Sequence, residues 1–536
     1  MIKSIKLIRQ NSEVNLGFVK IHDYKVDIDS SFLNGLSATI QIEFESPIIQ
    51  FRNHDYTWQN NEQKQFANWY APKILRLKNN QLVQANQHKG IWEFDNNNNS
   101  KVLLWHFNEN KGEPIAQYDS KNSKQIDQSN VECSDISPLA LLFPLNEGVE
   151  ISRSKMPFSA IACFTDHCDF DTLSNLIQQR EFFKTHGIKI TKGFFLNHYS
   201  KIEDTANFEN HNEEIKKWLE DGHELAYHSL SQSIKPLDIS LSDFETFKPP
   251  LEGITSWIDH GFQHYNVSRY KNYERIRNDY GSTLQNKGVT IFWNYIDSGT
   301  AARGVINQLN PNQFTLQAYY RGIKHLKLKA QVPMLIKNII FHYHNTDYSL
   351  RLYRDLAKYF KTLKFKKSKK KHVIVVINMF KLMKLLIPIL LFWRTRKNEV
   401  YPLTQYNPVI FNQDILKHTF TVFQTIEMVD FKLSLNPNNL DLLIKEKGLF
   451  IAHTYFSAPF NYHRGKLFKN INEVDREVEM NFSYLSKKII SKDIWNPTLK
   501  ELVSYLKKFN IVSFECTDAG ELIVIDENQL AFRKVH

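Results

Sequence analysis

Apolar and polar residues alternate over the first part of the chain, which is the pattern of strands with one buried face. The alternation is clearest in ATIQIEFES (residues 38–46), and residues 90–107 read as two strands around an Asn-rich turn. No group of titratable residues at catalytic spacing occurs here. We therefore expect a β-rich N-terminal domain over residues 1–150 that supports the rest of the chain or binds carbohydrate. Trp92 or Trp105 could stack on a sugar ring, but packing in the core is the expected role of both.

From about residue 157 the pattern changes to short apolar runs separated by helical segments. Gly187 and Gly222 end the two expected helices, since glycine favours the position just after a helix. Strands and helices that alternate at this spacing predict a parallel α/β sheet or barrel. The expected order is strand 158–165, helix 172–187, strand 189–197, helix 213–222 and strand 223–229. The first part of this domain is expected over 155–304, and its remainder, with a C-terminal hairpin, over 401–536.

The segment 305–400 interrupts this pattern as an insertion. It contains a lysine-rich run (residues 361–371) and then an apolar stretch (residues 373–393). The stretch is long enough to cross a bilayer, but Lys381 and Lys384 near its middle would each cost roughly 2.5–3.5 kcal/mol. A helix lying in the plane of a membrane surface fits better, with its cations at anionic headgroups. The alternative is a buried hairpin or helix beside a solvated lysine loop.

The distribution of charge favours a membrane surface over nucleic acid as the partner of this segment. The chain has a formal charge of +11, and residues 356–398 alone hold thirteen Lys and Arg with no Asp or Glu. The rest is therefore close to neutral, whereas a nucleic-acid groove needs cations along its length. We expect peripheral membrane contact through 361–397 and no nucleic-acid partner.

Cysteine usage and the N-terminal residues bear on the cellular compartment. Four scattered cysteines without a CxxC pair argue against a disulfide scaffold and against a zinc ribbon. The first residues lack the long apolar core of a secretory signal. We therefore expect a cytoplasmic protein, peripheral on the inner membrane face.

Titratable side chains gather where the predicted strands end. Asp166, His167 and Asp169 follow the first strand, and His228 and His453 lie at the ends of the third strand and of a later one. Because the carboxyl ends of parallel strands meet at one edge of a sheet, we expect these side chains to converge. Carboxylates with imidazoles suit a divalent cation such as Zn²⁺. The alternatives are a polar turn after the first strand that caps the next helix, and single histidines with structural roles.

The motifs at these strand ends resemble those of a known family. Residues 164–169 (FTDHCD) are similar to its first, Asp-containing motif. Residues 222–224 (GHE), followed by His228, are similar to its second motif, and residues 450–453 (FIAH) are similar to its last. On these residues the chain resembles the polysaccharide deacetylase superfamily, the NodB-homology or carbohydrate esterase family 4 group. The resemblance covers both parts of the expected α/β domain and leaves out the insertion.

The resemblance implies an α/β fold of the distorted (β/α)7 barrel type. It also implies the activity of that family, whose members remove N- or O-acetyl groups from sugars with a divalent metal. It implies Asp166 as general base and His453 as general acid. It also implies His167, Asp169 and His228 at the metal. The register between His167 and Asp169 stays open, because His167 stands where the family usually has Asp.

One departure concerns the second motif. Gln232 stands where the family has its second metal histidine, and an amide oxygen is a poorer ligand than imidazole. Residues 257–261 and 294–297 lie in the order of the middle motifs, but neither matches closely.

These observations predict a metal-dependent hydrolase that removes acetyl groups from an acetylated amino sugar or a polysaccharide precursor. The alternatives are a catalytically impaired carbohydrate-binding or scaffold protein, and a metal-dependent amidohydrolase that acts on a non-sugar amide.

Overall fold

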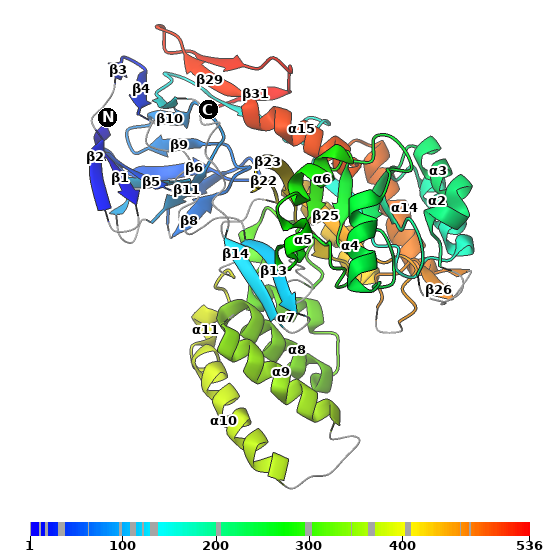
Figure 1. The fold of residues 1–536 in the computed structure, drawn as a ribbon. Coiled ribbons are helices and arrows are strands. Elements are labelled where there is room, and N and C mark those ends of the chain that lie inside the picture. The colour runs from blue at the N-terminus through cyan, green and yellow to red at the C-terminus, as the bar shows by residue number, and fades with distance from the viewer. Residues whose placement is uncertain are drawn as a thin grey trace.

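The structure of the protein is a computed structural model. It describes residues 2–9, 12–16, 20–29, 38–62, 64–95, 99–107, 114–120, 123–128, 138–199, 205–294, 303–344, 346–362, 370–401, 409–460, 463–470 and 473–536. The chain forms three lobes: a β-rich N-terminal region that also carries the C-terminal strands, an α/β region, and a lobe of helices (Figure 1).

The N-terminal region consists of two antiparallel sheets packed around one core. One sheet has the order β2-β1-β5-β12-β11-β8, and the other has the order β3-β4-β15-β10-β9-β6-β7. Trp92 and Trp105 lie at its centre, fully buried, with their rings 5.8 Å apart at an interplanar angle of 85°. Both tryptophans therefore pack in the core and are not available to stack on a sugar. The bounds are β1 Ile2–Arg9, β2 Ser12–Leu16, β3 Lys20–His22, β4 Lys25–Ile28, β5 Ala38–Phe44, β6 Ile48–Arg52, β7 Trp58–Asn60, β8 Gln65–Ala67, β9 Ile74–Leu77, β10 Leu82–Ala85, β11 Ile91–Phe94, β12 Val102–Phe107 and β15 Leu139–Leu142.

The α/β region is built on one curled sheet with the order β22-β23-β21-β20-β19-β18-β17-β25-β24, and β28 also pairs with β17. All neighbouring strands are parallel except β22 and β23. The sheet is curled. Because its two end strands do not pair within the described residues, it forms a half-barrel and not a closed barrel. The bounds are β17 Ala160–Asp166, β18 Thr191–Phe194, β19 Glu224–His228, β20 Ser256–Ile258, β21 Ile291–Trp293, β22 Ile410–Ile415, β23 His418–Phe423, β24 Ile426–Glu427, β25 Leu449–Thr454 and β28 Ile494–Trp495.

Side chains on the parallel strands alternate between two cores, as the two-residue repeat of a strand requires. On the outer face, Phe164 of β17 packs with Phe183 of α2 and Trp218 of α3. On the inner face, Cys163 shares a core with Ile451 of β25 and with apolar residues of α15. The helices that cover the sheet (Figure 1) are α2 Leu173–His186, α3 Phe208–Glu220, α4 Leu237–Thr246, α5 Glu274–Arg277, α6 Tyr280–Asn286, α12 Phe431–Ser434, α13 Pro437–Lys445, α14 Arg476–Ile490 and α15 Leu499–Ile511.

Local signals place the ends of these helices. The side chain of Thr172 accepts a hydrogen bond from the Asn175 backbone N–H at the start of α2, and Gly187 ends that helix with φ of 63°. Thr498 and Glu501 form a reciprocal capping box at the start of α15. The sequence predicted the C-terminal end of α2 from Gly187, whereas the N-cap at Thr172 is a finding of the structure.

The insertion forms a lobe of helices. Four apolar side chains, Leu316, Ile339, Leu386 and Ile389, make a small core of their own there. The helices are α7 Leu316–Ile323, α8 Leu328–Ile339, α9 Asp347–Thr362, α10 Lys370–Leu391 and α11 Trp393–Arg396, with a π-helical turn over Ile340–His344. Most of the lysine-rich run (residues 363–369) lies outside the described residues.

A buried ion pair ties the C-terminus to the N-terminal region. Strand β16 (Gly148–Ile151) pairs with β31 (Phe532–Val535), and β29 (Ser513–Cys516) and β30 (Leu522–Ile525) form a hairpin beside them. The fully buried carboxylate of Glu150 accepts hydrogen bonds from Arg52 at 2.9–3.0 Å and from Arg533 at 2.6 Å. Removing a buried partner is costly, because it leaves the other charge uncompensated.

We predict that Glu150→Gln lowers the free energy of unfolding by about 3–5 kcal/mol, measured by urea denaturation. Glu147→Gln is the matched control, because Glu147 makes an ion pair with Lys534 at the protein surface and exposed pairs contribute little. Equal denaturation midpoints for the two variants would show that the buried pair does not fasten the C-terminus.

Candidate metal centre

Histidines from several strands converge on the inner face of the curled sheet. His228 ends β19, His453 lies in β25, and His167 directly follows β17. Each follows inward-facing residues at the two-residue spacing of a strand; Cys163 and Ile451, for example, belong to the inner core. Because these strands are parallel, their carboxyl ends lie at the same edge. His167, His228 and His453 are each no more than 3% exposed.

Asp169 is the carboxylate at the centre of this cluster. Its Oδ2 lies 3.0 Å from Nε2 of His228, and its Oδ1 lies 2.7 Å from Nδ1 of His260. His167, Asp169 and His228 each offer a ligand atom, and these atoms lie within 4.8 Å of one another. A carboxylate between imidazole nitrogens at such distances is a donor set typical of zinc and similar divalent cations.

Backbone carbonyls fix which nitrogen of each histidine faces Asp169. Nδ1 of His228 lies 3.3 Å from the carbonyl oxygen of Ile258, and Nε2 of His260 lies 2.7 Å from that of Gln232. Since a carbonyl oxygen only accepts, each of these nitrogens carries the proton. When a cation is bound, the nitrogens that face Asp169 can then offer it their lone pairs. Metal-binding histidines are oriented in this way by partners behind them, so the residues fit a divalent cation.

The charges of the cluster are set by burial and by mutual contacts. Burial alone would raise the pKa of Asp169, but the neighbouring His260 and His228 outweigh it and hold that pKa well below its usual value. Burial opposes a charge on His260 as well, yet the Asp169 carboxylate raises the pKa of this histidine. Burial lowers the pKa of His228. Without a cation, the Asp169 carboxylate therefore favours a charge on His260, whereas His228 stays the less readily protonated of the two.

A second pair of histidines lies beside this triad. The rings of His167 and His453 stack with their centroids 3.7 Å apart at an interplanar angle of 20°. Trp293 of β21 lies edge-on to both rings, at 4.8 Å and 4.9 Å. Among the described residues, Nε2 of His167 is buried and has no hydrogen-bond partner. Burial, followed by the nearby His453, lowers the pKa of His167 well below its usual value.

Asp166, which the family resemblance implied as general base, points to the opposite face of the sheet. It is one residue before His167, so alternation directs it outward. Its carboxylate accepts hydrogen bonds from the Lys192 ammonium, from Thr454 Oγ1 at 3.0 Å and from the Phe456 N–H at 3.2 Å. Burial raises its pKa to about 6. The structure therefore does not bring Asp166 together with Asp169 and the inward-facing histidines.

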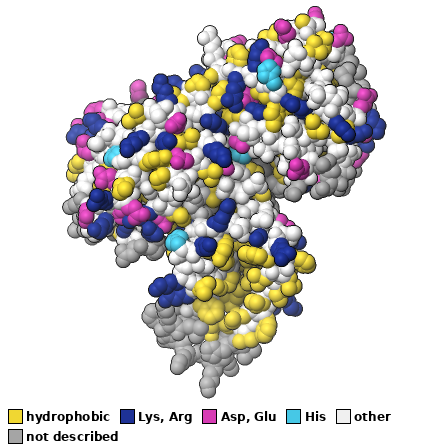
Figure 2. Space-filling view, turned by 180° about the vertical axis from the view of Figure 1, so that it is seen from behind, with side chains coloured by type: hydrophobic (Ala, Val, Ile, Leu, Met, Phe, Trp, Pro, Cys, Tyr) yellow, Lys and Arg dark blue, Asp and Glu magenta, His cyan; other side chains and the backbone are white. Residues whose placement is uncertain are grey.

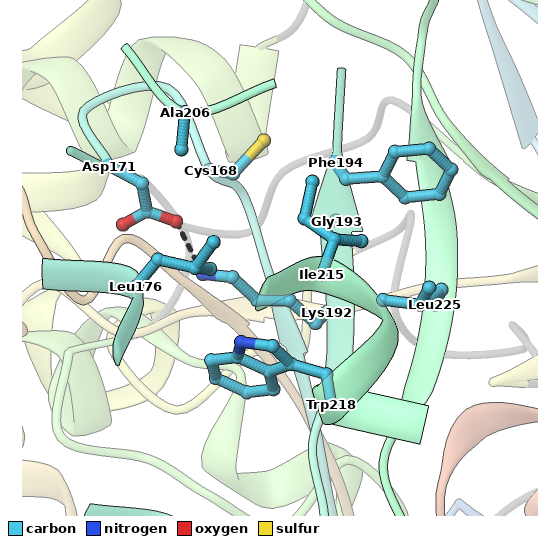
Figure 3. A pocket seen from close by; sticks show the side chains of 10 residues that line it. All are labelled: Cys168, Asp171, Leu176, Lys192, Gly193, Phe194, Ala206, Ile215, Trp218 and Leu225. Carbon is cyan, nitrogen blue, oxygen red and sulfur yellow. Dashed lines mark hydrogen bonds and ion pairs between the residues drawn. The ribbon is translucent and has the colours of Figure 1, made fainter. Parts of the chain in front are cut away.

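The outward network around Asp166 is complete in itself. The ammonium of Lys192 also binds the Asp171 carboxylate and the side-chain oxygen of Gln179, and it lies 5.1 Å from the ring centre of Trp218. Figure 3 shows Lys192 and Asp171 at a small cavity among apolar side chains of α2, α3 and β18. Each charge has an opposite charge beside it, which is the arrangement of a structural ion pair.

His260 is the residue that the sequence reading missed. The structure gives Gln232 a supporting role: its Nε2 donates to the Asp169 backbone carbonyl at 2.8 Å, and its Oε1 contacts His198. His260 instead stands opposite Asp169, two residues beyond Ile258 of β20. The signal in the sequence is a histidine two residues after Ile258, since residues two apart on a strand point to the same face.

Asp259 fixes the loop that carries His260. Its carboxylate accepts hydrogen bonds from the indole N–H of Trp257 at 3.0 Å and from the backbone N–H groups of Val267 and Ser268, each at 2.9 Å. Asp259 is thus fully engaged and has no role at the cation. The last part of the other middle segment, residues 295–297, lies outside the described residues.

No protein-family model and no curated protein matches the chain. Among solved structures, the GH31 dextranase FjDex31A of Flavobacterium johnsoniae, complexed with glucose, is similar at a TM-score of 0.25 and 9% identity, covering 99% of this chain and 72% of that chain. A substituted form of the same enzyme, complexed with isomaltotriose, gives 0.25 and 8% with the same coverage. At this TM-score the likeness carries no argument about fold or function.

The buried His167 predicts a pH dependence of stability. The folded protein keeps this ring neutral, whereas the unfolded chain protonates it below about pH 6.5, the ordinary histidine value. Its contribution is therefore fully present above that pH and is lost as the pH falls. With a chelator present, we expect the unfolding free energy of His167→Gln to fall less steeply between pH 6.5 and 4.5, by up to about 1.4 kcal/mol per pH unit. Parallel curves for variant and parent would contradict a buried neutral ring.

Proposed function

We propose that the protein is a metal-dependent hydrolase that removes acetyl groups from an acetylated amino sugar or a polysaccharide precursor, on a sheet of the distorted (β/α)7, polysaccharide-deacetylase type. The observation that carries the proposal is the placement of Asp169 between two histidines whose other nitrogens are held by backbone carbonyls. The proposal also rests on the motif resemblance at three strand ends.

Asp169, His228 and His260 would hold the cation, with His167 beside them. Nitrogen and carboxylate ligands favour Zn²⁺ or a similar ion over Mg²⁺ or Ca²⁺. When bound, the cation would polarise the acetyl carbonyl and lower the pKa of a water beside it. His260 supplies the imidazole that the second motif lacks at Gln232. This removes the reason for supposing that the site is impaired.

The stacked pair of histidines supplies proton transfer in this proposal. When the proton of the neutral His167 ring is on Nδ1, its Nε2 has a lone pair, and among the described residues this nitrogen has no hydrogen-bond partner. It can therefore take a proton from the attacking water. His453, stacked on it and equally buried, can give a proton to the leaving amine or alcohol. Burial keeps the His167 ring neutral, which is the form that accepts a proton, whereas His453 must be protonated to donate one. Asp166 takes no part, because its carboxylate is bound to Lys192 behind the sheet.

The first test is metal content. After incubation of the full chain with Zn²⁺ and removal of excess ion, we expect about one ion per chain by elemental analysis. Asp169→Asn and His260→Gln should weaken binding at least roughly tenfold, because each removes a ligand. His223→Gln is the matched control, since His223 belongs to the same motif but accepts a hydrogen bond from the Ile190 N–H. Full zinc content in His260→Gln would contradict the proposed ligand set.

The second test separates chemistry from structure. On a panel of N-acetylated hexosamine oligomers and simple N-acetyl amides, we expect His453→Gln to lower kcat by roughly 10²- to 10⁴-fold with zinc retained. Asp166→Asn should instead lower thermal stability while the folded enzyme keeps its turnover. A loss of kcat in Asp166→Asn comparable to that of His453→Gln, at full folding and zinc content, would contradict this division. Turnover of the simple amides alone would indicate an amidohydrolase that does not act on sugars.

A further inference from the structure

The insertion lobe carries an apolar surface with no partner in the described chain. Only 11% of the stretch Ile374–Leu391 of α10 is buried, although the stretch is long and apolar enough to cross a membrane. Phe380 is 68% exposed and Leu391 is 74% exposed. Figure 2 shows apolar side chains gathering over this lobe, in contrast to the mixed surface of the other two lobes. Exposed apolar patches of this kind mark interaction sites.

The apolar residues of α10 are divided between two faces. Leu382, Leu386 and Ile389 recur at helical spacing and pack with Leu316 of α7 and Ile339 of α8. Exposed apolar side chains cover most of the remaining surface of the helix. At about 100° per residue, Met379, Leu390, Met383, Val376, Ile387, Phe380 and Leu391 form one continuous arc beside the packed face, and Ile377 and Ile374 lie beyond it. One face of α10 thus fastens it to the lobe, and the other faces outward.

The cations of α10 lie along one edge of the outward arc. By the same helical repeat, Lys384 falls next to Phe380 and Leu391, and Lys381 lies about 60° further round the helix, past Ile377. Over residues 374–398 there is no Asp or Glu, while Arg394 and Lys397 follow at the C-terminal end. An apolar arc bordered by cations is the pattern of a helix that lies in a membrane interface. Anionic headgroups would complement these cations.

Two other arrangements fit this surface less well. A second copy of the chain would bring apolar arcs together but would supply no acid from 374–398 for Lys381 and Lys384. In a spanning helix, each of these central lysines would cost roughly 2.5–3.5 kcal/mol. In addition, the inward face of α10 is already packed against α7 and α8, which holds the helix at the surface of its lobe.

We propose that α10 docks the protein on an anionic lipid surface, lying in the plane of the interface with the arc from Val376 to Leu391 among the acyl chains. Lys381 and Lys384 then reach the headgroups alongside it. This inference rests on the insertion lobe alone and is independent of the chemistry at Asp169.

The test is flotation of the full chain with preformed vesicles of phosphatidylcholine, alone or in equal parts with phosphatidylserine. We expect the parent to float with the mixed vesicles. Lys381→Gln with Lys384→Gln should lower binding to the mixed vesicles about 25-fold, since each cation near an anionic surface contributes about fivefold, and should leave binding to neutral vesicles unchanged. Phe380→Ser with Leu391→Ser should lower binding to both kinds.

Ile490→Ser is the matched control, because Ile490 is 77% exposed at the end of α14, outside the insertion lobe; it should float like the parent. Phe380 and Leu391 are exposed, so their substitution leaves the core intact, and circular dichroism checks this. A parent that stays with the soluble fraction would overturn the proposal. So would equal flotation of the Phe380/Leu391 variant. A parent dimer by sedimentation that this variant makes monomeric, without flotation, would assign the surface to a second copy.

Discussion

The carboxylate of Asp169 is the interaction on which the arrangement of the inner face depends. It is mostly buried, and a buried charge needs opposite charge or hydrogen-bond donors around it. His228 and His260 provide these from two neighbouring parallel strands, and Gln232 holds the Asp169 backbone from behind. The strands can bring these groups together because parallel pairing aligns their carboxyl ends, and the two-residue repeat decides which side chains face inward.

The same repeat produces a second polar site on the opposite face, and the two sites differ in their charges. On the outer face, the Lys192 ammonium lies between Asp166 and Asp171, so a cation of the protein itself already stands between the two carboxylates. On the inner face, one carboxylate stands among four imidazoles, and Nε2 of His167 has no partner within the described residues. The outer site is built like a structural ion pair, whereas the inner site offers lone pairs to a cation.

The sequence predicted the strand ends, the glycine that ends α2 and the grouping of Asp169 with His228, because these follow from local patterns and parallel pairing. It could not assign Asp166 to a face. Strand β17 is buried on both sides, so Ala162, Cys163 and Phe164 are all apolar and show no alternation from which to count. It did not predict His260 as a ligand, because the spacing of the second motif places the second metal histidine at position 232, where this chain has Gln232. A ligand supplied by a neighbouring strand is a long-range contact that no local pattern encodes.

The central claim is that Asp169, His228 and His260 converge on one cation. Anomalous diffraction from crystals of the full chain soaked in Zn²⁺ tests it most directly. The account predicts a single strong anomalous peak about 2.0–2.2 Å from a carboxylate oxygen of Asp169, Nε2 of His228 and Nδ1 of His260. A zinc ion bound away from these three residues, with Asp169 still hydrogen-bonded to both histidines, would contradict the proposed ligand set.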